Sequence, residues 1–481
     1  MEHTGHVQID RKSIPYHLID DRVVLIPNNV YSMLFSSEVK EKKLIKGITT
    51  GNRNVLFLNC KYDANSLVYQ AMIISESNTG MYNDFSNFDR ICFEGIPVNV
   101  FAGPGKAYDF ENGYDISKRM FAVTPKEWDK INIKTNTKIK SKNIKLSIDY
   151  MFRPNNKYAE TSMGEAIPRF CIEYEKPQNI KKIPEIYLMG YDFFAFLNFR
   201  RNIKFDNIYM QRKNGDKYET IARIFVKQHN LGTYTNTENN SIVIDDIKED
   251  FGNLFKNVAT RRQNRIYDNF FIPCNDEKNS QISYEAFLSC ALSFESEYSR
   301  IYPSKKEEKE KYAYLQNLFI NSAEKLNEMV TLFEDKKISK DDFEKMYFGM
   351  INPIVESKLS EVSKTQGRDY KGYYENIIDT LSKLDFSLGE KYKKALITNH
   401  EIINPVIKRV CSANNIVFPT EQEAGNLFSK FRNGIAHGNP EEIQTIHWVL
   451  YVVARALIYV LVLRKSDVKE DKIKIIVSKL F

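Results

Sequence analysis

Short apolar runs separated by turn-rich segments characterise the chain up to about residue 270. Apolar and polar residues alternate with period two in 131–134, 144–148 and 169–174, and more continuous apolar runs occur at 23–26, 55–58, 69–74 and 221–226. Such runs predict the strands of a mostly antiparallel sheet. Asn214-Gly215 lies between two apolar runs and predicts a hairpin turn. Pro97 would place the run 96–100 at a sheet edge or a bulge.

After about residue 280 the apolar positions recur with a helical period. Residues 284–298 and 315–333 each have one apolar face, and shorter helices are expected around 340–350, 371–385 and 390–412. Thr420 followed three residues later by Glu423 is a capping-box pattern, which predicts the start of another helix. Gly438-Asn439-Pro440 predicts where that helix ends.

The last predicted helix, roughly 441–465, is very apolar from Ile446 to Leu463. About 20 apolar residues suffice to cross a membrane, so this segment has to be considered as a span. His447 and Arg455 interrupt the apolar run, and no basic flank precedes it. These features favour a helix buried in a bundle, or also in a dimer interface, and predict no contact with a membrane.

These patterns predict an α+β protein of more than one domain. A β-rich antiparallel domain would occupy residues 1–270, and an all-α bundle would occupy 271–481. The length of 481 residues is too great for one ordinary domain, and 42% hydrophobic residues allow sizeable cores.

Charge and cysteine content add weaker constraints. Lysine and arginine total 69 against 62 aspartate and glutamate, a net charge of +7, which permits a polyanionic partner without requiring one. The six cysteines are scattered without CxxC pairs or metal-ligand spacing, so reduced thiols in a cytoplasmic protein are expected. The first residues do not resemble a secretory signal. No cofactor and no metal are expected.

Arginine, asparagine and histidine cluster in Phe431-Arg432-Asn433-Gly434-Ile435-Ala436-His437-Gly438, at the predicted helix end. Residues four apart share a helix face, so Asn433 and His437 are neighbours. The long stem of Arg432 allows its guanidinium to reach the same place. His437 would act as acid or base in cleavage of an RNA phosphodiester, Arg432 would stabilise the phosphoryl charge, and Asn433 would orient the histidine or bind a phosphate oxygen.

A purely structural interpretation of these residues competes with the catalytic one. Arginine and histidine at this spacing are frequent in helices, and His437 could belong to a helix C-cap while Arg432 makes a surface ion pair. One such set lacks paired acid and base groups, whereas a two-fold dimer would bring two sets together. Arg201-Asn202-Ile203 serves as an internal comparison, because it begins with the same dipeptide but lacks the histidine and falls in the β region.

The Arg-Asn-x-x-x-His-Gly pattern at 432–438 resembles the HEPN superfamily of ribonucleases, over roughly residues 280–470. The resemblance implies an all-α HEPN bundle, a metal-independent endoribonuclease and a homodimer. It also implies an acidic residue near the cleft on an earlier helix, for which Glu295 is the candidate and Glu297 the competitor. Each of these glutamates taken alone would also suit an ordinary helix surface.

The layout of a β-rich half before such a bundle looks like the ApeA family of antiphage defence proteins. That resemblance implies an abortive-infection effector that is restrained until infection and then cuts host RNA, typically tRNA anticodon loops. The β-rich domain would be the sensor, with a phage protein as trigger. The alternative is a non-catalytic RNA-binding or dimerisation module that serves as a sensor or as the partner of another effector.

Other segments suggest weaker sites. Gly103-Pro104-Gly105-Lys106 hints at a phosphate loop but lacks the full spacing, so a turn is expected. The cluster 261–265 is basic and would suit either an RNA backbone or a solvated linker. Arg200-Arg201 among phenylalanines would suit an RNA surface or a sheet face. His447 is expected to pack.

Overall fold

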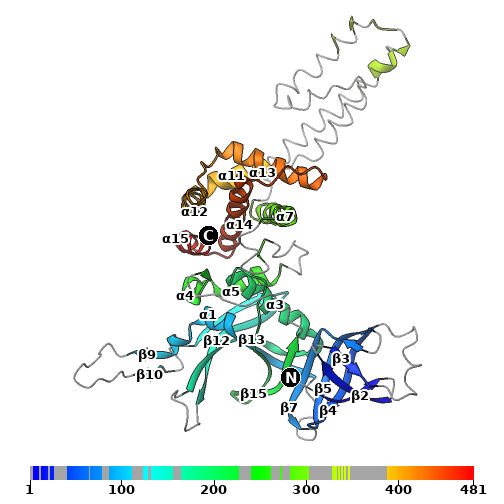
Figure 1. The fold of residues 1–481 in the computed structure, drawn as a ribbon, viewed down its shortest axis with the longest axis vertical. Coiled ribbons are helices and arrows are strands. Elements are labelled where there is room, and N and C mark those ends of the chain that lie inside the picture. Colours follow the sequence, from blue (N-terminus) through cyan, green and yellow to red (C-terminus); the bar gives the residue numbers. More distant parts are fainter. Residues whose placement is uncertain are drawn as a thin grey trace, which may run out of the picture. The chain divides into compact units, whose positions relative to one another are not determined.

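The structure is a computed structural model that describes residues 4–9, 12–19, 22–26, 41–63, 66–78, 86–110, 123–127, 132–154, 164–226, 240–261, 271–273, 282–302, scattered positions between 325 and 346, and 387–481. The fold is α+β, with a β-rich N-terminal region followed by a helical C-terminal region, as predicted (Figure 1). The helices expected around 315–333, 340–350 and 371–385 lie wholly or mostly outside the described residues.

The strands are β1 (Thr4–Ile9), β2 (Lys12–Ile19), β3 (Arg22–Leu25), β4 (Glu41–Thr49), β5 (Arg53–Asp63), β6 (Ser66–Val68), β7 (Ala71–Asn78), β8 (Asn87–Glu94), β9 (Tyr108–Phe110), β10 (Val123–Pro125), β11 (Ile133–Ile139), β12 (Lys142–Pro154), β13 (Gly164–Asn179), β14 (Asn207–Asn214) and β15 (Lys217–Val226). The α-helices are α1 (Ile96–Ala102), α3 (Ile183–Leu197), α4 (Ile244–Ile247), α5 (Phe251–Ala259), α7 (Tyr284–Ile301), α11 (Leu388–Thr398), α12 (His400–Ala413), α13 (Glu421–Ala436), α14 (Thr445–Lys465) and α15 (Glu470–Leu480). Two short 3-10 helices are η1 (Pro104–Ala107) and η2 (Ile180–Lys182).

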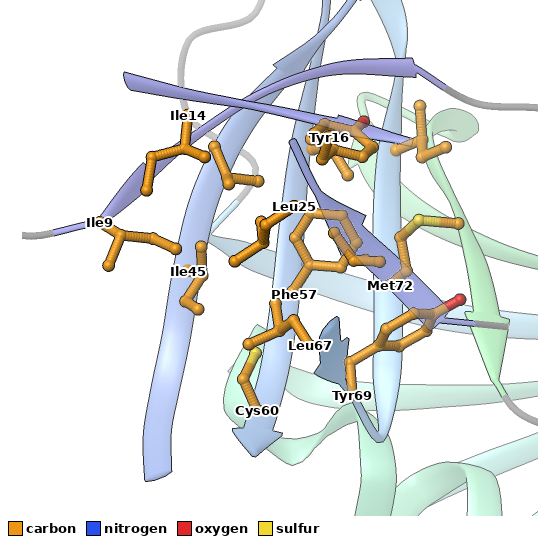
Figure 2. Close-up of a cluster of buried hydrophobic side chains, with 14 residues drawn as sticks. Ile9, Ile14, Tyr16, Leu25, Ile45, Phe57, Cys60, Leu67, Tyr69 and Met72 are labelled. Atoms are coloured by element: carbon orange, nitrogen blue, oxygen red, sulfur yellow. The ribbon is translucent and has the colours of Figure 1, made fainter. Parts of the chain in front are cut away.

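Within the described residues, thirteen strands form one antiparallel sheet in the order β11-β12-β13-β8-β14-β15-β7-β5-β4-β1-β2-β3-β6. β6 also pairs with β5, which closes β1 to β6 into a six-stranded barrel. Alternation fills the barrel with apolar side chains, as the inward residues of β1 show. Tyr16 and Phe57 meet edge to face there, with ring centroids 5.6 Å apart (Figure 2). The predicted hairpin is confirmed, because β14 ends at Asn214 and Gly215 has a φ of +59°.

One face of the open part of the sheet is covered by α1, α3 and α5. Aromatic side chains from the helices and the sheet interlock in this layer, for example Phe170 with Phe193 at 5.9 Å and Phe193 with Phe255 at 5.2 Å. α3 was not predicted from the sequence, because the helix is buried on nearly every side and so lacks a polar face. The run 96–100 was predicted as a strand but forms α1, since Pro97 at the first turn fixes a helical φ and strand β8 ends at Glu94.

Cys92 on β8 and Cys171 on β13 are opposite each other, with Cα atoms 4.2 Å apart, and form a disulfide. The expectation that every cysteine is a reduced thiol is therefore wrong for this pair. The two residues are 79 positions apart, so only the strand pairing brings them together. Cys60, Cys290 and Cys411 are buried free thiols.

The chain divides into two compact units. The first comprises Met1–Glu297, Leu396–Phe418 and Phe431–Phe481, and the second comprises Tyr298–Ala395 and Pro419–Lys430. Helices α12, α14 and α15 therefore belong to the same unit as the sheet. In the second unit α11 packs closely on the first part of α13, because Gly389 and Gly425 face each other and Tyr392 stacks on Phe428 at 4.3 Å.

α14 lies at the centre of the helical part of the first unit. Tyr459 donates a hydrogen bond to the carbonyl oxygen of Phe196 (2.6 Å), and Asn257 on α5 donates to that of Val462 (3.2 Å). Arg455, which interrupts the apolar run, is 2% exposed and lies 4.3 Å from the ring centroid of Tyr451. Burial among α3, α5, α12 and α15 thus accounts for the apolar sequence of α14.

Candidate functional site at the end of α13

The N-terminal end of α13 is fixed by the predicted capping box. The backbone N–H of Thr420 donates to the Glu423 carboxylate (3.0 Å), and that of Glu423 donates to the Thr420 hydroxyl (3.3 Å). Hydrogen bonds from Thr420 lower the pKa of the Glu423 carboxyl, because they favour its charged form. The sequence therefore identified this helix start correctly.

The C-terminal end of α13 is a Schellman motif. The Asn439 N–H donates to the carbonyl oxygen of Gly434 (2.9 Å), and the Gly438 N–H donates to that of Ile435 (3.2 Å). Gly438 has a φ of +76°, which glycine adopts at low cost. A Cβ atom on Gly434 would lie 3.0 Å from the Asn439 oxygen, so the chain turns back tightly over the helix end. His437 is the C-cap residue of this motif.

Arg432, Asn433 and His437 come together at this end. The Arg432 Nη1 atom donates to the Asn433 side-chain oxygen at 3.0 Å, so the guanidinium does bend toward the Asn433 side of the helix. The backbone N–H of His437 bonds to the Asn433 carbonyl oxygen at 3.0 Å, which places the two residues one turn apart. Asn433 and His437 are exposed and Arg432 is half-buried.

Hydrogen-bonding capacity remains unused in this group. The Arg432 Nε atom is shielded from solvent and has no hydrogen-bond partner among the described residues. Within that same part of the chain, the imidazole of His437 makes no hydrogen bond. A phosphate would therefore compete only with Asn433 for the Arg432 fork, and the imidazole is available to a reactant.

Phe431 anchors the arginine that follows it. Its buried ring stacks on His447 at 3.8 Å with an interplanar angle of 10°, and meets Phe287 edge to face at 4.8 Å. His447 is 3% exposed, and its Nδ1 accepts the backbone N–H of Gln444 at 3.0 Å. The prediction that His447 packs is confirmed. Sequence reasoning missed its stacking partner, because the stack joins two helices across the turn at Gly438.

The two candidate glutamates on α7 differ in environment. Glu297 is fully buried and accepts a hydrogen bond from Arg261 Nη2 at 2.6 Å, so it holds an internal ion pair. Glu295 is half-buried and lies two helical turns beyond Phe287, about 12 Å along the axis at 1.5 Å per residue. A role for Glu295 in the cleft stays a prediction.

Several weaker candidates have structural roles. Gly103–Lys106 forms a turn and part of η1, as expected, and Lys106 pairs with Asp245 at 2.5 Å. Arg261 is 1% exposed, so neither an RNA contact nor a solvated linker describes it, and the remainder of the cluster 262–265 lies outside the described residues. Arg200 and Arg201 follow α3 and lie outside every strand, so the sheet-face expectation is wrong. Arg200 is 4% exposed and therefore does not contribute to an RNA surface, whereas Arg201 is half-buried.

Two general properties bear on the site. In the described part of the chain, no group of three or more His, Cys, Asp or Glu residues is arranged to hold a metal ion. Among the same residues, α14 is the helix long and apolar enough to cross a membrane, with a mean hydropathy of 2.1, yet 89% of that stretch is buried inside the structure.

Comparison of the chain with protein-family models, curated proteins and solved structures finds no match.

Proposed function

We propose that this protein is a metal-independent endoribonuclease whose reacting groups are Arg432, Asn433 and His437. The observation that carries the proposal is their grouping at one helix end, with an exposed imidazole and an arginine fork already directed by Asn433. The Schellman cap and the Phe431 stack hold the backbone on both sides of the group. Such support matters because catalytic groups must be held close to their productive geometry.

The chemistry requires little beyond these side chains. His437 removes the proton from a ribose 2′-hydroxyl, or protonates the leaving 5′-oxygen. Arg432 stabilises the charge that develops on the phosphoryl oxygens, and Asn433 positions the guanidinium and a phosphate oxygen. Attack by the 2′-oxygen yields a 2′,3′-cyclic phosphate and a 5′-hydroxyl.

One set supplies a single histidine, whereas the reaction uses both an acid and a base. A homodimer with two sets facing one cleft supplies both. We further propose, from the resemblance to the HEPN and ApeA families, that the protein is a cytoplasmic antiphage effector. Its β-rich region would sense a phage protein, and its target would be host tRNA, with Glu295 assisting at the cleft.

The test compares the purified wild-type chain with His437→Ala and with His400→Ala, which removes another exposed histidine. Total RNA is the substrate, with and without EDTA, and the 3′ ends are mapped. Cleavage with cyclic-phosphate ends that persists in EDTA and in His400→Ala, and disappears in His437→Ala, is expected. Cleavage abolished by EDTA would refute the mechanism.

A restrained effector needs its trigger, so the same three chains are also tested in cells challenged with a phage panel. Protection with new cyclic-phosphate ends, both lost only in His437→Ala, is expected. Protection that survives in His437→Ala would favour the alternative of a non-catalytic RNA-binding or dimerisation module. A chain that stays monomeric at cleaving concentrations would contradict the shared cleft.

A further inference from the structure

The residues that line a groove in the β-rich region fall between 136 and 256, so they are distant in sequence from Arg432, Asn433 and His437. Two cavities of 620 and 90 Å³ share Ile144 and Tyr174 as lining residues. Asn253 and Lys256 on α5 line the larger cavity, and residues at the start of α3 line the smaller. α3 and α5 lie on the same side of the sheet (Figure 1). The larger volume is typical of a site for a small molecule.

The charge around the groove is positive. Six lysines and three glutamates line the two cavities. Lys145 is paired with Glu173, and Glu185 is shared by two other lysines. Lys138 and Lys256 have no carboxylate partner among the described residues, and Lys142 bonds there only to the neutral Gln178 (2.6 Å). These uncompensated ammonium groups would attract a phosphate.

The lining residue Tyr174 carries an unused polar group. It is 8% exposed and lines both cavities, yet its hydroxyl has no hydrogen-bond partner in the described part of the chain. A tyrosine hydroxyl can both donate and accept a hydrogen bond, so it is available to a ligand in the groove. Its ring, next to Ile144, also offers the aromatic surface that suits a flat base.

Amide groups complete the set. Asn136 makes no side-chain hydrogen bond within the described residues, and Asn253 donates to Asp467 at 3.1 Å, which leaves its oxygen available. Amides pair with the donor and acceptor edges of bases. Unpaired lysines, an aromatic ring with a spare hydroxyl and free amides together match the three parts of a nucleotide.

We propose that this groove binds a nucleoside phosphate, with Lys138 and Lys256 holding the phosphate and Tyr174 contacting the base or sugar. The inference is independent of the proposed cleavage. A free nucleotide and the phosphorylated end of an RNA chain both present a phosphate, a sugar and a base. The experiment therefore includes both ligands.

The test is isothermal titration calorimetry of the full-length chain with AMP, ATP, GTP, inorganic phosphate and a 5′-phosphorylated RNA tetranucleotide. The variants are the double change Lys138→Ala/Lys256→Ala and the single change Tyr174→Phe, which removes only the spare hydroxyl. Lys176→Ala is the matched control, because Lys176 is exposed on the same strand as Tyr174 but does not line the groove. Circular dichroism checks that each variant is folded.

Saturable binding of at least one nucleotide, tighter than that of phosphate, is expected. The double variant should weaken it about tenfold or more, Tyr174→Phe a few-fold, and Lys176→Ala not at all. Binding of the RNA alone, with the same variant pattern, would assign the ligand to an RNA end. The proposal is overturned if no probe saturates at about 1 mM, if the double variant binds like the wild type, or if phosphate binds as tightly as any nucleotide.

Discussion

The dipeptide Arg-Asn occurs after α3 as Arg201-Asn202 and near the end of α13 as Arg432-Asn433, and the two regions use it differently. Asn202 is 6% exposed, while the Arg201 backbone accepts a hydrogen bond from Tyr191 and donates one to Pro273 (2.9 Å). Asn433 is exposed and accepts from the Arg432 guanidinium. Both arginines are half-buried, so the difference lies in the asparagines: Asn202 is buried, whereas Asn433 is exposed beside an exposed histidine. The same side chain therefore gains or loses chemical availability with its burial.

The largest expected effect concerns His437, the exposed histidine beside Asn433. His437→Ala should reduce RNA cleavage about 10³-fold, since general acid–base catalysis contributes roughly 10²- to 10⁴-fold. The free energy of unfolding should hardly change, because the imidazole is exposed and unbonded among the described residues. Single-turnover cleavage and urea unfolding measure the two quantities. Equal loss of activity in His400→Ala would show that the effect is not specific.

Arg261 and Glu297 form a buried ion pair, so its removal should lower the free energy of unfolding. Glu297→Ala should lower the free energy of unfolding by about 3–5 kcal/mol, because it leaves a buried guanidinium without its carboxylate. Arg432→Ala, an arginine change at the half-buried site, should lower it by less than about 1 kcal/mol. Urea titrations of both variants provide the measurement. Similar losses in the two variants would mean that the buried ion pair contributes no more to stability than the half-buried Arg432.

A smaller effect is expected at the helix end itself. Gly434→Ala introduces a Cβ atom that would lie 3.0 Å from the Asn439 oxygen, so the turn after His437 must shift. We expect a loss of about 1–2 kcal/mol in unfolding free energy, together with a fall in kcat for cleavage. Gly105→Ala is the control, because a Cβ atom there meets nothing within 4 Å. Unchanged cleavage in Gly434→Ala would mean that the site tolerates movement of this turn.

The smallest effect concerns the opposite end of α13. Thr420→Ala should lower the unfolding free energy by about 1 kcal/mol through loss of the cap, without altering cleavage. The pKa of Glu423 is lowered in the folded chain, so the carboxylate stabilises the fold above its unfolded pKa. That contribution is lost as the pH falls through the folded pKa. Urea unfolding of both chains from neutral to acidic pH should therefore show the difference shrinking at low pH.

Local patterns predicted much of the fold where one face of an element is solvated. The alternating strands, the Asn214-Gly215 hairpin and both ends of α13 were predicted because a few neighbouring residues determine each of them. α3 and the break at Asn399 between α11 and α12 were missed. The first is apolar on every side, and the second depends on packing rather than on a proline or glycine.

The sequence by itself determined the helix that carries Arg432, Asn433 and His437 and the place where that helix stops, because capping and turn chemistry are local. Only the tertiary structure decided which arginines are available, since Arg261 is buried against Glu297 of α7, 36 residues further along the chain. It alone paired Cys92 with Cys171, stacked His447 on Phe431 and assembled the lysine-lined groove. Each of these arises from strand register or helix packing, which brings together residues whose separation along the chain carries no local signal.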